Sequence, residues 1–235
     1  MRVPFGFKNY VRMFKSRGIR YPLSYFFQVR WFDIKMHVDT HLWVPREFES
    51  WSLPNSSHGI IYMASLTKDI KKSFDAVQQL LGKEFESHDF LDLGSGKGKV
   101  VLLWHILCGK KKIKQSIRGI EYSEALVEIS RANFESVFKR PAGDIFVCED
   151  VTNFDFSELR EHIIVFLANP FDDLIIFKVI EKIKSKKVLV IYSTPTHVKV
   201  FKESGFSEVQ KLKNNWLGSD FDILLLANFE VKSVT

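Results

Sequence analysis

Cysteine is scarce in this chain of 235 residues, with Cys108 and Cys148 as its two thiols. Two thiols cannot form a structural zinc site by themselves, and no group of histidines has the spacing of metal ligands. The sequence therefore predicts no metal site. Both cysteines lie in apolar stretches, so we expect buried, reduced thiols and a cytoplasmic location.

Long hydrophobic runs are also missing. No apolar stretch approaches the ~18 residues of a membrane span, nothing resembles the apolar region of a secretory signal, and neither internal repeats nor low-complexity segments are present. No catalytic triad or hydrolase-like pair of carboxylates stands out. The net charge of +6, from 34 basic and 28 acidic residues, is compatible with an anionic partner without requiring one. The length fits a single α/β domain with an extension.

The most informative segment is Phe-Leu-Asp-Leu-Gly-Ser-Gly-Lys-Gly, residues 90–98. Apolar residues around Asp92 predict a short buried strand, and the apolar run after the segment predicts a helix. Gly94, Gly96 and Gly98 predict a tight turn between them. Free N–H groups and the helix dipole favour a ligand in such a turn, and we expect glycines because a Cβ would block that ligand or forbid a positive φ.

Phosphate-binding and dinucleotide-binding loops both require glycine where this chain has Lys99. The D-x-G-x-G-x-G pattern instead resembles the first motif of the class I S-adenosylmethionine-dependent methyltransferases, whose loop surrounds the methionine end of the cofactor. The resemblance assigns five residues to S-adenosylmethionine: Asp92, Gly94, Ser95, Gly96 and Gly98. A tight turn without a ligand is the alternative.

Two further acidic strand ends extend this resemblance. Glu121 ends a predicted second strand, where a carboxylate accepts hydrogen bonds from ribose hydroxyls, and Tyr122 would lie against the adenine. A polar stretch at residues 109–116 predicts an enlarged loop before this strand. Asp150 follows a third predicted strand, and the resemblance assigns it to the adenine amino group, with the Val151 N–H beside it. Solvated loop acids are the alternative for both carboxylates.

Asn169, Pro170 and Phe171 directly follow another predicted buried strand. They resemble the N-P-P-[YF] motif of amine-methylating members of the family, shortened by one proline. In those enzymes the asparagine oxygen accepts a hydrogen bond from the substrate nitrogen and the aromatic ring stacks on the substrate. The resemblance therefore implies N-methylation with these three residues as the catalytic set. An ordinary Asn-Pro turn is the alternative.

The remaining pattern predicts helices at 172–184 and 196–204 and strands at 187–193, 207–213 and 221–229. Together with the resemblance, which covers about residues 65–229, this implies an α/β fold. The expected architecture is a Rossmann-like, seven-stranded, mostly parallel sheet with helices on both faces and a C-terminal antiparallel hairpin. We expect a methyltransferase domain at 65–235 and an N-terminal extension at 1–64.

The N-terminal extension is basic and aromatic: seven cationic residues precede the first acid, Asp33. Such an arm could bind nucleic acid, lie on an anionic membrane surface, or form a structural cap. The cap interpretation is slightly favoured, with aromatic residues packed inward and arginines facing water. The segments 32–40 and 58–62 resemble the lead-in of a group of bacterial methyltransferase-like proteins, through a Val-Asp-Thr sequence and an imperfect pairing of Gly59 with Tyr62.

The sequence thus predicts a methyltransferase that uses S-adenosylmethionine, and N-methylation of an RNA, a protein or a small molecule. Two alternatives stay open: a non-catalytic cofactor- or RNA-binding protein with the same fold, and a small-molecule O-methyltransferase. The acceptor and the oligomeric state are not predicted.

Overall fold

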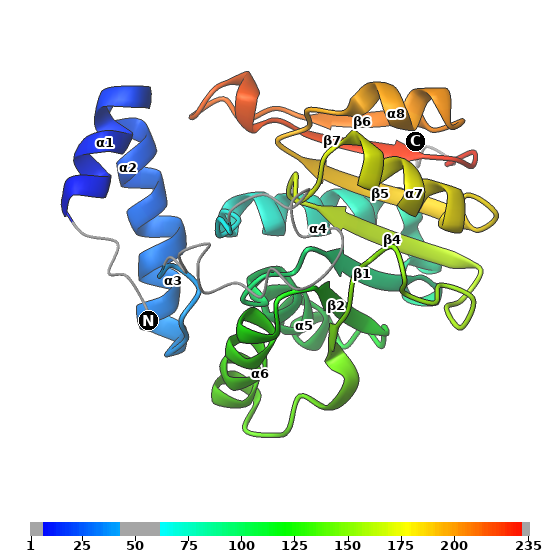
Figure 1. Ribbon diagram of the computed structural model, residues 1–235, viewed down its shortest axis with the longest axis horizontal. Coiled ribbons are helices and arrows are strands. Elements are labelled where there is room, and N and C mark those ends of the chain that lie inside the picture. The colour runs from blue at the N-terminus through cyan, green and yellow to red at the C-terminus, as the bar shows by residue number, and fades with distance from the viewer. Residues whose placement is uncertain (1–6, 43–61, 232–235) are drawn as a thin grey trace.

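Four N-terminal helical segments precede a mixed sheet flanked by helices (Figure 1). The computed structural model describes residues 7–42 and 62–231. The helical elements are α1 (Phe7–Arg17), α2 (Arg20–Tyr25), η1 (Phe26–Arg30), α3 (Trp31–Met36), α4 (Thr67–Leu81), η4 (Gly82–Ser87), α5 (Lys99–Lys111), α6 (Glu124–Phe138), η5 (Gly143–Ile145), α7 (Asp173–Ile183), α8 (Val198–Glu203) and η6 (Ser219–Phe221). The strands are β1 (Asp89–Leu93), β2 (Ile117–Glu121), β3 (Phe146–Cys148), β4 (His162–Leu167), β5 (Lys187–Ser193), β6 (Ser207–Leu212) and β7 (Ile223–Ala227).

The seven strands form one sheet in the order β3-β2-β1-β4-β5-β7-β6. The first five strands are parallel, and β7 is antiparallel to both β5 and β6. This arrangement confirms the predicted Rossmann-like sheet with its closing hairpin. The order reverses at β1, whose neighbours are β2 and β4, and a crevice for a ligand forms at such a point.

The strands and helices of the second half begin and end near the predicted positions. β5 has the predicted bounds, and Asp172 caps α7 through a hydrogen bond from the Ile175 N–H (3.1 Å). β3 is shorter than expected and forms one edge of the sheet. Because an edge strand is covered less completely, Cys148 at its end is exposed, and the prediction that it is buried is wrong. Cys108 on α5 is buried as predicted.

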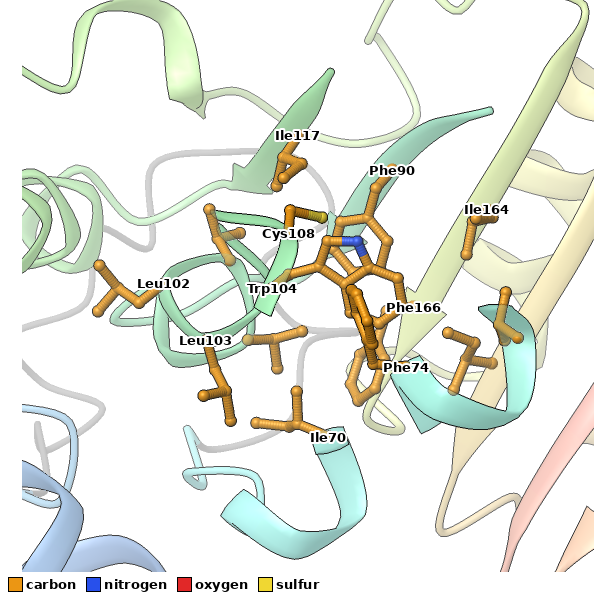
Figure 2. Close-up of a cluster of buried hydrophobic side chains, with 14 of the residues drawn as sticks. Ile70, Phe74, Phe90, Leu102, Leu103, Trp104, Cys108, Ile117, Ile164 and Phe166 are labelled. Atoms are coloured by element: carbon orange, nitrogen blue, oxygen red, sulfur yellow. The ribbon is translucent and has the colours of Figure 1, made fainter. Parts of the chain in front are cut away.

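Helices cover both faces of the sheet, as expected. On one face, α4, α5 and α6 pack a cluster centred on Trp104, which is fully buried. The Trp104 ring lies 3.9 Å from Phe90 of β1 and 4.8 Å from Phe74 of α4, measured between ring centroids (Figure 2). On the other face, α7 and α8 cover a second cluster that contains Leu91 and Val165. The parallel strands are buried on both faces, which explains their continuous apolar sequences.

The N-terminal helices α2, η1 and α3 run as one helix over residues 20–36, with a π-helical turn at η1. Val29 and Phe32 are buried on its inner side, but Phe27 and Trp31 are exposed. The expectation that the aromatic residues pack inward is therefore only partly correct.

The arginines near the start of this region are exposed, as expected, and two of them also contact a distant part of the chain. Arg17 forms an ion pair with Asp220 (3.5 Å), and the Arg20 guanidinium lies 5.0 Å from the Trp216 ring centroid. Both contacts reach the loop between β6 and β7. Among the described residues, no helix combines the length and the apolarity needed to cross a membrane.

Candidate functional site

A cavity of about 200 Å³ opens at the carboxyl ends of β1, β2 and β4, where the strand order reverses. From the sequence we predicted twelve site residues, and eight of them line this cavity. These are Asp92, Gly94, Ser95, Glu121, Tyr122, Asn169, Pro170 and Phe171. Four others do not line it: Gly96, Gly98, Asp150 and Val151.

The three glycines of the turn make room for the protein's own side chains, and their assignment to the cofactor stays a prediction. A Cβ on Gly94 would lie 2.4 Å from the Pro170 Cβ, and one on Gly96 would lie 2.3 Å from the Tyr62 ring. Both residues also have positive φ, +76° and +53°, which only glycine adopts without strain. A Cβ on Gly98 would meet the Phe146 ring at 2.7 Å.

The N–H groups of the turn are also engaged within the protein. Gly94 and Ser95 donate to the Ile120 carbonyl (2.9 and 3.0 Å), and Gly96 donates to Glu121 Oε2 (2.8 Å). The second carboxylate oxygen of Glu121, Oε1, accepts from the Ser123 N–H (3.0 Å). The expected anion-binding turn is therefore not formed by these donors, and Glu121 instead stabilises the loop while lining the cavity.

Asp92 is the most unusual polar group at the site. It is buried, and within the described structure its Oδ2 has no hydrogen-bond partner. Burial, and secondarily the charge of Glu121, raises the pKa of Asp92 well above its usual range. Asp92 and Glu121 thus place two neighbouring carboxylates on the wall of the cavity. Such a site favours a ligand with a cationic group or N–H donors, because that ligand would satisfy Oδ2 and offset the repulsion.

Asp150 lies in the turn after β3. Its Oδ1 accepts two hydrogen bonds from Thr152, from the N–H and the hydroxyl (both 2.8 Å). The side chain is buried, and neither it nor Val151 lines the cavity. Their assignment to the adenine stays a prediction.

Asn169 lines the cavity, but its amide oxygen is already bonded. Oδ1 accepts from the Thr196 hydroxyl (2.6 Å) and the Tyr192 hydroxyl (3.2 Å). The Tyr192 oxygen itself accepts from the N–H groups of Thr196 and His197 (3.4 and 3.2 Å), so its own proton is available to Asn169. This network orients the amide with its NH₂ group away from the two hydroxyls. The expected acceptor for a substrate amine is therefore occupied.

Phe171 and Pro170 line the cavity and also pack against the rest of the protein. Phe171 is 8 % exposed and belongs to the cluster beneath α7, which covers most of the ring expected to stack on a substrate. Pro170 rests against Gly94. The three residues that follow β4 thus shape one wall of the cavity, and Asn169 contributes its polar group.

The cavity also contains residues that the sequence analysis did not select, among them Asp69 of α4 and Lys99 of α5. Burial raises the pKa of Asp69 to about 6, although Lys72, Lys68 and Lys99 oppose this. Burial lowers the pKa of Lys99 to about 7. One signal was available in the sequence, because a lysine in the first turn of a helix opposes the helix dipole.

The segment after α3 is tied to the glycine turn. Lys97, which is fully buried, donates to Asp39 Oδ1 (3.0 Å) and to the Leu42 carbonyl (2.6 Å). Tyr62, which packs on Gly96, donates to the Thr40 carbonyl (2.7 Å). The expected Val-Asp-Thr segment therefore contacts the turn, whereas Gly59 lies outside the described residues.

Asp33, Asp39 and His41 come close enough together to suggest a cation site. However, Asp33 Oδ2 accepts from the N–H groups of Thr40 and His41 (2.6 and 2.7 Å), and Oδ1 accepts from the Thr40 hydroxyl. Asp39 is paired with Lys97. These bonds explain the cluster as the anchor of the segment after α3.

No protein-family model matches the sequence, and no curated protein is similar to it in sequence. Among solved structures, the chain is similar to magnesium protoporphyrin IX methyltransferase from Synechocystis PCC 6803 with bound SAM. That match has 12 % identity and a TM-score of 0.49, and it covers 89 % of this chain and 97 % of the other. The chain is also similar to the N-methyltransferase NodS from Bradyrhizobium japonicum, with 15 % identity, a TM-score of 0.46, and coverage of 67 % and 97 %.

Proposed function

We propose that this chain is an S-adenosylmethionine-dependent methyltransferase. The observation that carries the proposal is the buried, unpartnered Oδ2 of Asp92, which lines the cavity beside Glu121. The ammonium and sulfonium groups of S-adenosylmethionine suit a cavity that is lined by these two neighbouring carboxylates. A phosphate ligand would fit less well, because it requires free N–H groups, and those of Gly94, Ser95 and Gly96 already donate within the protein.

The cofactor supplies a methyl group that the sulfonium has already activated. The chain's own task is to hold it, to orient the nucleophile and to exclude water. We assign the ammonium end to Asp92 and the ribose hydroxyls to Glu121, because a carboxylate accepts several hydrogen bonds. Tyr122 is assigned to the adenine face, and Asp150 with the Val151 N–H to the adenine edge.

The sequence motif favours N-methylation, and the geometry modifies the role of Asn169 in it. Because its Oδ1 is bonded to two hydroxyls, Asn169 presents its N–H donors to the acceptor. The acceptor molecule then carries a hydrogen-bond acceptor, such as a carbonyl or a ring nitrogen, close to its nucleophile. RNA, protein and small molecules all include such groups.

O-methylation is the second candidate, and Asp69 is the observation in its favour. A hydroxyl nucleophile must lose a proton, and Asp69 is a cavity carboxylate with a pKa raised to about 6. A base with a pKa near the working pH is efficient in proton transfer. In this candidate Asp69 accepts that proton.

Calorimetric titration with S-adenosylmethionine and S-adenosylhomocysteine tests the proposal directly. We expect both to bind without added metal. Absence of binding by either ligand, on protein whose circular dichroism shows it to be folded, would overturn it. Transfer of labelled methyl groups to RNA, protein and small-molecule fractions would then identify the acceptor, with the Asp92→Asn variant as the background control.

The chemistry of the labelled product distinguishes the two candidates. A methylated nitrogen in the product supports N-methylation. A methyl ether or ester, together with loss of turnover in Asp69→Asn, supports O-methylation.

A further inference from the structure

The helix formed by residues 20–36 carries an apolar row on its outer side. Leu23, Phe27, Trp31 and Ile34 are exposed by 43, 62, 53 and 52 %. Their spacing of four, four and three residues places them on one face of the helix. We call these four residues the outer row. It extends along ~16 Å of helix, at 1.5 Å per residue.

The opposite face of the same helix is already buried. Tyr25, Val29 and Phe32 are at most 8 % exposed, and Lys99 Nζ donates to the Gln28 carbonyl (2.7 Å), which ties this face to α5. The helix is therefore apolar on two opposite sides. A surface helix normally has one apolar face, and a second, exposed one marks an interaction site.

Within residues 7–36, the exposed charges have a single sign. Between residues 7 and 36 there are seven cationic side chains, all exposed, and one acid, Asp33. Asp33 is buried and bonded to Thr40 and His41, so its charge is directed inward. Arg30 and Lys35 lie on the same helix as the outer row. The surface that a partner meets is thus apolar in the middle and cationic around it.

We propose that the outer row docks on an anionic lipid surface, with its side chains at the level of the headgroups. Interfacial helices combine tryptophan, phenylalanine and leucine on one face with lysine and arginine beside it. Tryptophan suits this position because its ring is apolar while its N–H remains in the wet region. Phe14 and Ile19, which are 51 and 57 % exposed, add apolar area to the same N-terminal region.

The charge and the apolar row favour a lipid surface over two other binding partners, a nucleic acid and a second copy of the chain. A nucleic acid would use the cations and the aromatic rings, but Leu23 and Ile34 would have no role in its binding. A second copy of the chain would place like charges opposite each other across a symmetric interface. An anionic bilayer satisfies both the apolar row and the surrounding cations, each worth about 1 kcal/mol at such a surface.

Co-sedimentation with vesicles tests the proposal. The probes are vesicles of phosphatidylcholine alone and of equal parts phosphatidylcholine and phosphatidylglycerol. We compare the full chain with a Phe27→Ser/Trp31→Ser variant and with an Arg30→Glu/Lys35→Glu variant. The matched control is Leu174→Ser/Phe177→Ser, because these two α7 residues are similarly exposed, by 46 and 49 %.

We expect the unaltered chain and the α7 control to sediment with the anionic vesicles and not with the neutral ones. The Phe27→Ser/Trp31→Ser variant should bind at least tenfold more weakly. The charge-reversed variant should bind more weakly by about fivefold or more per residue. Failure of the unaltered chain to bind anionic vesicles would overturn the proposal, as would an equal loss in the α7 control.

Trp31 permits a second measurement that does not disturb binding. Vesicles with brominated acyl chains should quench part of the protein fluorescence, and Trp31→Phe should bind equally well while losing that quenched part. Binding of RNA at low salt with no vesicle binding would reassign the surface to nucleic acid. Self-association that is lost in Phe27→Ser/Trp31→Ser, again with no vesicle binding, would reassign it to a second copy.

Discussion

Replacing Asp92 by asparagine should have opposite effects on stability and on cofactor binding. The carboxyl group is buried beside Glu121 with one oxygen unpartnered. Asparagine has nearly the same shape and carries no charge. The substitution therefore removes a group that lowers the stability of the free protein but contributes to the binding of the cofactor.

The expected size of each effect follows from the environment of Asp92. Asparagine removes the cost of ionising a buried carboxyl group beside Glu121, and each kcal/mol gained should raise the melting temperature by ~2–4 °C for a chain of this size. A hydrogen bond to a charged group contributes about 1.5–3 kcal/mol. Its loss should weaken S-adenosylmethionine binding about 10- to 150-fold.

The pH dependence gives an independent check on the same residue. Because the pKa of Asp92 is raised in the folded protein, the folded state holds a proton that the unfolded state has released. Stability from this group is full below its ordinary pKa and is lost as the pH rises through the raised pKa. A cationic ligand prefers the ionised carboxyl, so its affinity should increase over the same pH range, with release of a proton.

The assays are thermal unfolding without ligand and calorimetry in buffers of different ionisation enthalpy, which reports the protons released on binding. Asp144→Asn is the matched control, because Asp144 is exposed and loses the same charge. We expect proton release for the unaltered chain and for this control, and none for Asp92→Asn. If Asp92→Asn melts lower and binds S-adenosylmethionine normally, Asp92 is structural and our assignment of it is wrong.

Four further predictions concern other residues. Glu121→Gln should weaken cofactor binding about tenfold or more by calorimetry, and a ligand without ribose hydroxyls should show no such difference. Asn169→Ala should lower the rate of single-turnover methyl transfer by a factor of about 10²–10³, while cofactor affinity changes little. An unaltered rate would show that Asn169 only shapes the backbone turn. Lys97→Met should lower the free energy of unfolding in urea by about 3–5 kcal/mol, because it removes the buried ammonium group that pairs with the Asp39 carboxylate. In the native protein a thiol reagent should modify Cys148 and spare Cys108, whose pKa burial raises to about 12; equal labelling would contradict the burial difference.

Apolar runs predicted most of the sheet because a parallel strand buried on both faces needs a continuous apolar sequence. β5 was predicted with its exact bounds, and the two last strands were predicted as a pair. The sequence did not show which strand would lie at the edge of the sheet. β3 is an edge strand, so Cys148 is exposed although its local sequence resembles that of the buried strands.

The site was predicted less completely, since a sequence shows which donors and acceptors exist but not which of them are already paired. The turn N–H groups and the Asn169 oxygen both have partners that are remote in sequence: Glu121 for Gly96, and Tyr192 and Thr196 for Asn169. Burial of Lys99 depends on the N-terminal helices, which supply the Gln28 carbonyl. A lysine beside a glycine turn otherwise indicates a solvated position.

The docking of the N-terminal helices has a consequence for the order of folding. The N-terminal helices are synthesised before the residues that they contact. Arg17 pairs with Asp220, and Tyr21 packs against Phe221 with 5.4 Å between ring centroids. Domains generally fold as units during synthesis, yet the inner face of this helix lacks its partners until α5 has been made, and the contact of Tyr21 with Phe221 forms later still. The nascent protein therefore exposes both apolar faces of this helix until α5 has been made, and chaperone binding and aggregation should both depend on residues 20–36.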